Sequence, residues 1–127
     1  MNLHRIHQIG IYAKDLAEAV AFYRDTLGAK FIATFDPPGL AFFDFNGVRL
    51  LLEKGASKST VYFSVDDIDA ACAELKSRGV TFTHEPQFVH RDDSGNFGPR
   101  GGEEWMAFFT DPSGNVLALA SRKVSSR

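Results

Sequence analysis

The 127 residues, 44% hydrophobic and 24% charged, suffice for an ordinary globular core without a disulfide or structural metal. A formal net charge of -2 offers no excess of cations to a phosphate backbone, which argues against a nucleic-acid partner. No run approaches the roughly 18 apolar residues of a membrane span, and the first residues lack a signal-peptide stretch, so we expect a cytoplasmic protein with no membrane partner.

The first half of the chain predicts a strand, a helix and three further strands. A β-branched run over residues 5–13 is followed by Asp15, a typical N-cap, and by apolar residues at helical spacing up to Gly28, placed as a C-cap. Asn46-Gly47 is typical of a type I′ hairpin turn. The predicted elements are the strand 5–13, the helix 16–27 and the strands Lys30–Phe35, Leu40–Phe45 and Val48–Glu53.

The same order of elements begins again at Thr60. The N-cap Asp67 lies 52 residues after Asp15, and Gly79 lies 51 residues after Gly28, which indicates an internal repeat. The second half therefore predicts the strand Thr60–Val65, the helix 68–78, the strand Val80–Thr83, a strand ending near Val89, and the strands Trp105–Phe109 and Val116–Ala120.

The second half has one predicted strand more than the first, but the repeat indicates one βαβββ module in each half, and the predicted fold class is α+β. We expect one domain over residues 1–127, with repeats over 4–54 and 60–121. One module cannot bury both sides of its sheet, so we expect a strongly curved, mixed, eight-stranded sheet with the helices outside and a ligand-binding trough inside. The polar, glycine-rich segment 90–102 is either a lid on this trough, which we favour, or a disordered bulge.

Two motifs carry a family resemblance. Residues 22–28, Phe-Tyr-Arg-Asp-Thr-Leu-Gly, and residues 111–115, Asp-Pro-Ser-Gly-Asn, resemble the vicinal oxygen chelate superfamily, which includes glyoxalase I, bleomycin-resistance proteins and extradiol dioxygenases. The resemblance extends over nearly the whole chain. It implies the fold above, a homodimer, and in the enzymes of the family one divalent cation held by a ligand from each of four strands.

The positions that match those four ligands hold mostly unsuitable side chains. They are Gln8, whose amide oxygen can bind a metal, Leu51, Thr60 and Ala118. A two-residue slip would bring Glu53 inward in place of Leu51 and give a pair with Gln8. We therefore expect no cofactor, and at most Gln8 and Glu53 as metal ligands. His7 should face the other side of the sheet from its neighbour Gln8.

Strand alternation then predicts the lining of the trough. On the strand before the last turn, the family pattern places Glu104, Met106 and Phe108 inward; the opposite parity would place Trp105 there. Glu104 and Glu53 are the candidate catalytic bases, because burial would raise the pKa of a carboxyl group. The expected ligand-binding residues are Gln8, Tyr12, Arg49, Leu51, Thr60, Tyr62, Met106, Phe108 and Ala118.

This lining suits a small, partly apolar molecule, with Gln8, Arg49, Tyr62 and Glu104 as polar contacts. The sequence therefore predicts a small-molecule-binding protein without a complete metal site. Two enzymatic alternatives stay open: a metal-dependent lyase or isomerase of the glyoxalase I type, and a metal-free enzyme that uses carboxylate acid-base chemistry. Cys72, beside two alanines in the second predicted helix, is expected to be a buried apolar residue and not a nucleophile.

Overall fold

The computed structural model describes residues 1–124, so the last three residues of the predicted domain 1–127 lie outside the described residues. The chain forms two compact units. The first comprises Met1–Ser59 and Asp111–Asn115, and the second comprises Thr60–Thr110 and the chain from Val116 onward. No helix within residues 1–124 is long and apolar enough to cross a membrane.

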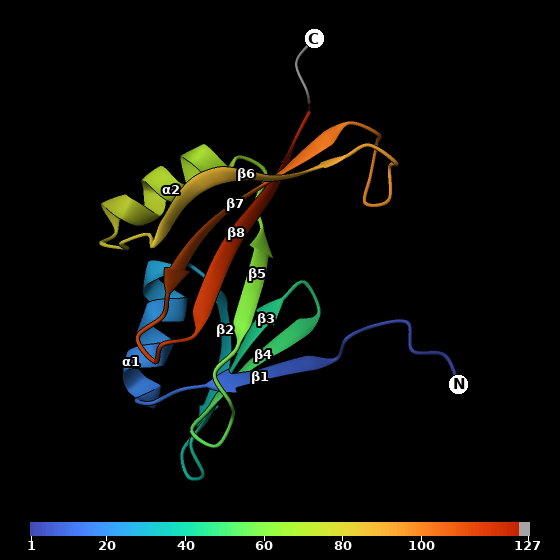
Figure 1. The fold of residues 1–127 in the computed structure, drawn as a ribbon. Helices are drawn as coiled ribbons and strands as arrows, with labels where there is room; N and C mark the ends of the chain where they lie inside the picture. The colour runs from blue at the N-terminus through green and yellow to red at the C-terminus, as the bar shows by residue number, and fades with distance from the viewer. Residues whose placement is uncertain (125–127) are drawn as a thin grey trace. The chain divides into compact units, whose positions relative to one another are not determined.

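The first unit is a four-stranded mixed sheet with one helical segment on one of its faces (Figure 1). The strand order is β1-β4-β3-β2, in which β1 runs parallel to β4 and the other neighbours are antiparallel. Its elements are β1 (Gln8–Tyr12), α1 (Leu16–Ala21), the π-helical η1 (Phe22–Thr26), β2 (Lys30–Phe35), β3 (Leu40–Phe45) and β4 (Val48–Glu53).

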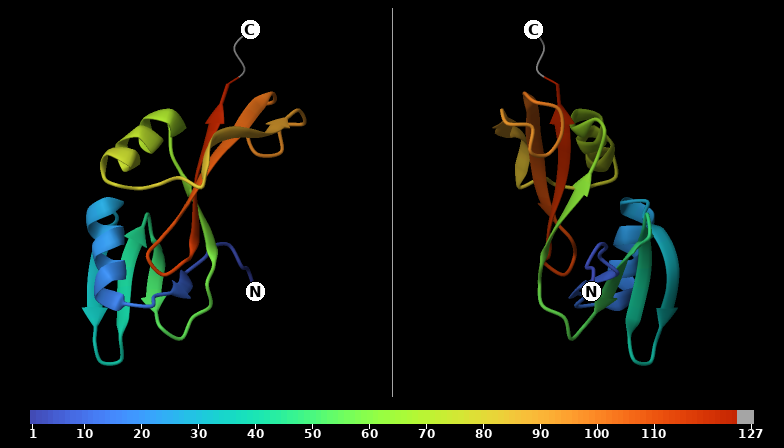
Figure 2. Two further views of the ribbon diagram at one scale, coloured as in Figure 1. Left: turned by 60° about the vertical axis from the view of Figure 1, so that its left-hand side comes forward. Right: turned by 90° about the vertical axis from the view of Figure 1, so that its right-hand side faces the viewer.

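The second unit repeats this plan. The strand order is β5-β8-β7-β6, again with one parallel pair, β5 and β8. Its elements are β5 (Thr60–Ser64), α2 (Ile68–Ser77), β6 (His84–Asp92), β7 (Gly102–Thr110) and β8 (Val116–Lys123). Figure 2 shows, from two sides, α1 against one face of the first sheet and α2 against one face of the second. The prediction of an α+β fold made of two βαβββ modules is confirmed, with the eight strands hydrogen-bonded as two sheets of four.

Each helix covers the apolar face of its own sheet. In the first unit Ile11, Phe43 and Leu52 are fully buried, and the ring of Tyr23 packs 5.7 Å from that of Phe43. In the second unit Phe109 and Leu117 are fully buried on the side of α2. Because side chains alternate along a strand, the residues between these buried ones point to the side of each sheet that its helix does not cover. We call this side the first open face in the first unit and the second open face in the second unit.

The local signals acted largely as predicted. The Asp15 carboxylate accepts a hydrogen bond from the Glu18 amide, as an N-cap does, and Asp67 does the same for Ala70. Asn46 and Gly47 both have positive φ, 54° and 95°, as a type I′ turn requires. Three strands of the first unit have the predicted bounds.

The predicted strand Val80–Thr83 is wrong. These residues form an irregular connection, and the strand begins only at His84. The aromatic packing expected from the repeat is nevertheless present, because the ring of Phe82 lies 5.2 Å from that of Phe109, as the ring of Phe31 lies 5.5 Å from that of Phe43. Side-chain packing was thus conserved where the backbone hydrogen bonding was not.

The segment 90–102 is shorter as a loop than predicted, since β6 continues to Asp92 and β7 starts at Gly102. Buried Asp92 organises what remains: its carboxylate accepts the amides of Asn96 and Phe97, and the Arg122 guanidinium at 3.0 Å. These hydrogen bonds, led by that of Phe97, lower the pKa of Asp92 to about 2. Its backbone carbonyl accepts the amides of Gly95 and Gly101, so the loop is tied to its own strands, and a role as a lid stays a prediction.

Candidate functional site

The two motifs behind the resemblance meet inside the first unit. The Tyr23 hydroxyl donates a hydrogen bond of 2.7 Å to the carboxylate of buried Asp111. That carboxylate also accepts the backbone amides of Ser113 and Asn115 and the side-chain amide of Asn115. Burial and the neighbouring Asp111 raise the pKa of Tyr23, so its hydroxyl stays a donor. All these groups are used inside the fold, so the motifs hold the turn 111–115 in place.

Asn115 extends this network to two other segments of the first unit. Its amide nitrogen donates to the carbonyl of Tyr12 at 2.6 Å, and its amide oxygen accepts the backbone amide of Ser59 at 2.9 Å. It is fully buried. The turn, the end of β1 and the segment before β5 are therefore joined through one side chain, and none of its polar atoms is left for a ligand.

A polar row crosses the first open face. The backbone register places Gln8 opposite Arg49, Arg49 opposite Asp44, and Asp44 opposite Lys30, on four adjacent strands. The Arg49 Nε donates to the Gln8 Oε1 at 3.0 Å, and the Phe42 ring centre lies 5.7 Å from the Arg49 guanidinium carbon. Asp44 is directed elsewhere, because its carboxylate accepts the Gly47 amide in the turn.

His7 also contacts Arg49, contrary to the predicted alternation. The His7 Nε2 lies 2.7 Å from the Nη2 of Arg49. Alternation fails here because β1 begins only at Gln8, so His7 is not held in strand geometry. The arginine donates only if the imidazole is neutral, with its proton on Nδ1. The guanidinium is thus contacted by Gln8, His7 and the Phe42 ring.

The next rows of the first open face are less polar. Gly10, Leu51 and Phe42 are in register on three strands, and Tyr12 and Glu53 on two. Leu51, Tyr12 and Glu53 are all half-buried. Five predicted site residues of this unit therefore share one face: Gln8, Tyr12, Arg49, Leu51 and Glu53.

The second open face carries a row of aromatic rings. Tyr62, Ala118, Phe108 and His84 are in register on all four strands. The ring centres of Tyr62 and Phe108 lie 6.2 Å apart, and those of Phe108 and His84 lie 5.7 Å apart. Strands two apart in a sheet are about 9.6 Å apart, so the rings of Tyr62 and Phe108 lean together over Ala118, which is fully buried.

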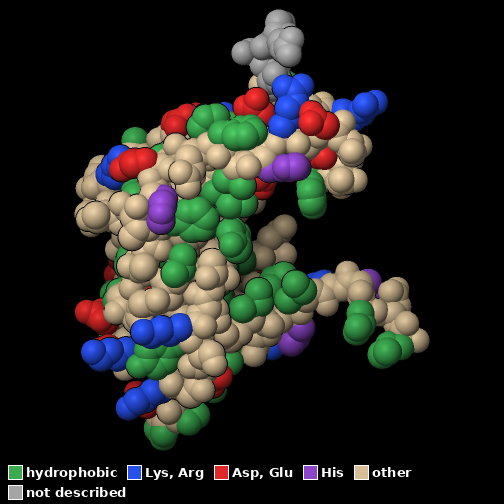
Figure 3. All heavy atoms as spheres, in the orientation of Figure 1, with side chains coloured by type: hydrophobic (Ala, Val, Ile, Leu, Met, Phe, Trp, Pro, Cys, Tyr) green, Lys and Arg blue, Asp and Glu red, His purple; other side chains and the backbone are tan. Residues whose placement is uncertain are grey.

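The remaining predicted residues of the second unit lie on the same face. Met106 is opposite Ala120, Glu104 is opposite Arg122, and Thr60 is opposite Val116. Trp105 lies on the side of α2, where the Lys123 ammonium stacks 4.2 Å from its ring centre and pairs with Asp69 of that helix. Figure 3 shows hydrophobic side chains gathered over β5, β7 and β8.

A metal ion fits the residues of this chain poorly. Within residues 1–124 no group of three or more His, Cys, Asp or Glu is placed to hold one. The Gln8 amide oxygen is already bonded to a guanidinium, whose charge repels a cation. Gln8 and Glu53 are not brought together. Gln8 is opposite Arg49 and Glu53 is opposite Tyr12, so the two residues lie about 13 Å apart along the strand direction. Two oxygens on one cation are about 5 Å apart or less. The side chains of Ala118 and Leu51 have no atom that can coordinate a metal, and Ala118 also lies beneath the rings of Tyr62 and Phe108.

The two candidate bases are not buried as the hypothesis required. Glu53 and Glu104 are both partly exposed, and neither forms an ion pair in the described part of the chain. Cys72, by contrast, is 3% exposed in α2, and burial raises the pKa of its thiol, which agrees with an apolar and unreactive residue.

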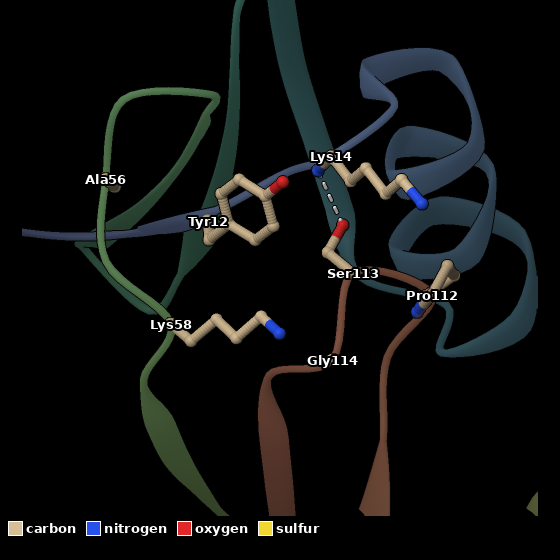
Figure 4. Close-up of a pocket in the computed structure, with 7 residues that line it drawn as sticks. All are labelled: Tyr12, Lys14, Ala56, Lys58, Pro112, Ser113 and Gly114. Carbon is tan, nitrogen blue, oxygen red and sulfur yellow. Dashed lines mark hydrogen bonds between the residues drawn. The ribbon is translucent and has the colours of Figure 1, made fainter.

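The structure also has a hollow that sequence reasoning missed, drawn in Figure 4. Its volume is ≈ 620 Å³, and it is lined by Tyr12, Lys14, Ala56, Lys58, Pro112, Ser113 and Gly114. The Lys14 amide donates to the Ser113 hydroxyl oxygen at 2.9 Å. Of the predicted site residues only Tyr12 lines this hollow. The other walls come from Lys14 after β1, from the segment before β5 and from the turn 111–115, which no sequence signal brings together.

Comparisons with known proteins agree with this architecture. Residues 5–119 match the model of the Glyoxalase/Bleomycin resistance protein/Dioxygenase superfamily. A probable lactoylglutathione lyase of Vibrio cholerae is 28% identical over 140 residues, which cover 97% of this chain and 94% of that protein. A lactoylglutathione lyase of Haemophilus influenzae is also 28% identical, over 95% of this chain and 92% of that protein.

Solved structures share the fold. The crystal structure of a lactoylglutathione lyase from Agrobacterium tumefaciens matches with a TM-score of 0.69 at 24% identity, covering 92% of each chain. An antibiotic binding protein from a Streptomyces species matches with a TM-score of 0.71 at 23% identity, covering 97% of this chain and 99% of that one.

Proposed function

Since the chain belongs to the glyoxalase, bleomycin resistance protein and dioxygenase superfamily, we propose that it binds a small, partly apolar molecule, and that the apolar part of this molecule packs on the second open face. The observation that carries the proposal is the row of Tyr62, Phe108 and His84. Its rings stand on a sheet surface that α2 does not cover, and Tyr62 is 57% exposed. Aromatic rings with a polar tip at hand are typical of small-molecule sites.

The fold is compatible with a binding role. The Streptomyces protein that shares it is named an antibiotic binding protein. The donor set points the same way, because the four positions that would hold a cation carry Gln8, Leu51, Thr60 and Ala118, of which only the first has a suitable side chain, already bonded to Arg49. We therefore propose that binding requires no divalent metal.

A second candidate is a metal-dependent lyase or isomerase of the glyoxalase I type. It is favoured by the names of the curated relatives, which are lactoylglutathione lyases. Elemental analysis of the purified protein separates the two candidates. About one Ni, Zn, Mn or Fe per chain, lost when Gln8→Ala is introduced, would support the lyase and overturn the metal-free proposal.

The binding proposal is tested with a neutral fluorescent apolar probe, N-phenyl-1-naphthylamine. We expect saturable binding to the wild type and about tenfold weaker binding to Tyr62→Ala, because an aromatic contact contributes roughly 0.5–1.5 kcal/mol beyond area burial. The matched control is Phe88→Ala. Phe88 is 51% exposed on the same sheet but packs on Trp105 at 6.1 Å, on the other face. Equal weakening by both variants, or no saturable binding, would refute the proposal.

The family resemblance implies a homodimer. The composition and the sequence pattern favour a cytoplasmic protein that acts on a small molecule and not on nucleic acid. Light scattering of the purified protein measures the mass, and a monomer at micromolar concentration would contradict the dimer. Fractionation of the source cells tests the compartment.

A further inference from the structure

We infer that the first open face binds the anionic group of a small organic ligand, a carboxylate or phosphate, through Arg49. This inference goes beyond the proposed function, because it concerns a separate hollow within the first unit and an anionic class of ligand. It starts from a hollow of ≈ 580 Å³ in the first unit, lined by Arg5, His7, Lys30, Phe31, Ile32, Asp44, Gly47 and Arg49.

The charges in this hollow do not balance. Three basic side chains, Arg5, Lys30 and Arg49, line it together with one acidic side chain, Asp44. None of the three basic groups forms an ion pair within residues 1–124. Asp44 is positioned to neutralise Arg49 across the β3-β4 register, but its carboxylate is bonded to the Gly47 amide. The hollow therefore carries an excess of positive charge that a small anion can neutralise.

Arg49 is held in a fixed orientation before any ligand arrives. Its Nε donates a hydrogen bond to Gln8, and its Nη2 lies 2.7 Å from the His7 Nε2. The guanidinium carbon lies 5.7 Å from the centre of the Phe42 ring. A free arginine side chain loses about 2 kcal/mol of rotamer entropy on being ordered. Here the protein's own contacts order it, so less is lost when a ligand binds.

The bonds to Gln8 and His7 use two of the five guanidinium N–H donors, and three remain. Paired donors of this kind match the two oxygens of a carboxylate or phosphate. Neither partner of Arg49 carries a negative charge, because the side chain of Gln8 is an amide and that of His7 is an imidazole. The arginine is thus positioned by groups that leave its charge unpaired, which is what an anion site needs.

The hollow also offers apolar contact. Ile32 lines it and is 48% exposed, whereas the ring of Phe31 is packed on buried Phe43. A small organic anion such as an aromatic carboxylate can therefore place its charged group at Arg49 and its apolar part on the wall.

The test compares benzoate with benzamide, which have the same shape and differ in charge. In titrations of ¹⁵N-labelled protein we expect benzoate to bind at least tenfold more tightly than benzamide and to shift the Arg49 Nε–H resonance. Arg49→Gln should abolish the difference between the two probes. Arg24→Gln is the matched control, because Arg24 is exposed on the same unit and, among residues 1–124, forms an ion pair with Asp25 alone; this variant should bind both probes like the wild type.

Gln8→Glu tests the same idea without removing the arginine. A carboxylate at this position would form an ion pair with Arg49 and compete with the ligand, so benzoate should bind about as weakly as benzamide. Phenyl phosphate replaces benzoate in a parallel titration, and preference for either anion over benzamide supports the inference. Equal binding of benzamide and of both anions to the wild type, or an unchanged difference in Arg49→Gln, would overturn it.

The two proposals fail in distinguishable ways. Binding of N-phenyl-1-naphthylamine that is sensitive to Tyr62→Ala, together with equal binding of benzamide and both anions, would overturn the anion inference and leave the proposed function standing. Preference for benzoate that depends on Arg49, without binding of the neutral probe, would overturn the proposed function and leave an anion site alone.

Discussion

The two modules repeat one backbone plan, but the side chains on their open faces differ in chemistry. The row Gln8–Arg49–Asp44 in the first module corresponds to Thr60–Val116–Thr110 in the second, in the same register. Charged groups thus occur on one face where the other has hydroxyls and an aliphatic side chain. Repetition preserved the strands and left the exposed positions free to diverge.

The next row differs in the opposite sense. Gly10, Leu51 and Phe42 of the first module correspond to Tyr62, Ala118 and Phe108 of the second. A glycine is replaced by a tyrosine whose ring leans towards Phe108, and a leucine by an alanine beneath it. The open face of the first module therefore carries charged side chains, on which the anion inference rests. The open face of the second carries aromatic side chains, on which the proposed function rests.

The two modules also differ in how their last hairpin turn is held, and the largest expected effect tests this. In Asp111→Ala, four hydrogen-bond donors lose their buried acceptor. We expect a loss of about 3–5 kcal/mol in the free energy of unfolding, measured with urea.

The matched variant is Asp44→Ala in the Asn46-Gly47 turn of the first module. Asp44 there accepts one backbone amide, that of Gly47, so the expected loss is about 1 kcal/mol. Similar losses for the two variants would show that the buried network around Asp111 contributes no more than an ordinary turn hydrogen bond.

This contrast explains why the sequence predicted the fold more fully than the side-chain contacts of the candidate site. The motifs at 22–28 and 111–115 are recognisable because Tyr23 and Asp111 must meet in the interior, a requirement of folding that leaves a fixed pattern. The type I′ turn and both N-caps were likewise predictable, because each depends on residues within a few positions.

The features of the site depend instead on distant residues. Alternation places Arg49 on the correct face, but it cannot show that Gln8 and His7 hold the guanidinium while Asp44 is turned away. It also cannot show that two rings meet over Ala118. His7 and the strand Val80–Thr83 were wrongly predicted for one reason: the exact residue at which a strand begins is set by tertiary contacts and not by local pattern.

The aromatic pairs provide a finer test of the repeat. The rings of Phe31 and Phe82 each pack on the last core phenylalanine of their own module, at 5.5 and 5.2 Å, although Phe31 lies in a strand and Phe82 in a connection. If side-chain packing and not strand membership decides their contribution, Phe31→Leu and Phe82→Leu should each lower the free energy of unfolding by about 1 kcal/mol. Urea denaturation measures both, and a markedly smaller loss for Phe82→Leu would contradict the equivalence.

The most local effect is expected at Asp92, whose loop 93–101 has no counterpart in the first module. The pKa of Asp92 is lowered from 3.8 to about 2 because the folded loop donates hydrogen bonds to its carboxylate. A group whose pKa is lower in the folded state stabilises that state above its unfolded pKa, and this contribution disappears as the pH falls from about 4 to about 2. The amides of Asn96 and Phe97 should therefore lose protection from hydrogen exchange over that range before the protein unfolds. In Asp92→Asn, which keeps the shape but not the charge, protection should be weak at every pH, and exchange that follows global unfolding in both proteins would contradict a local role.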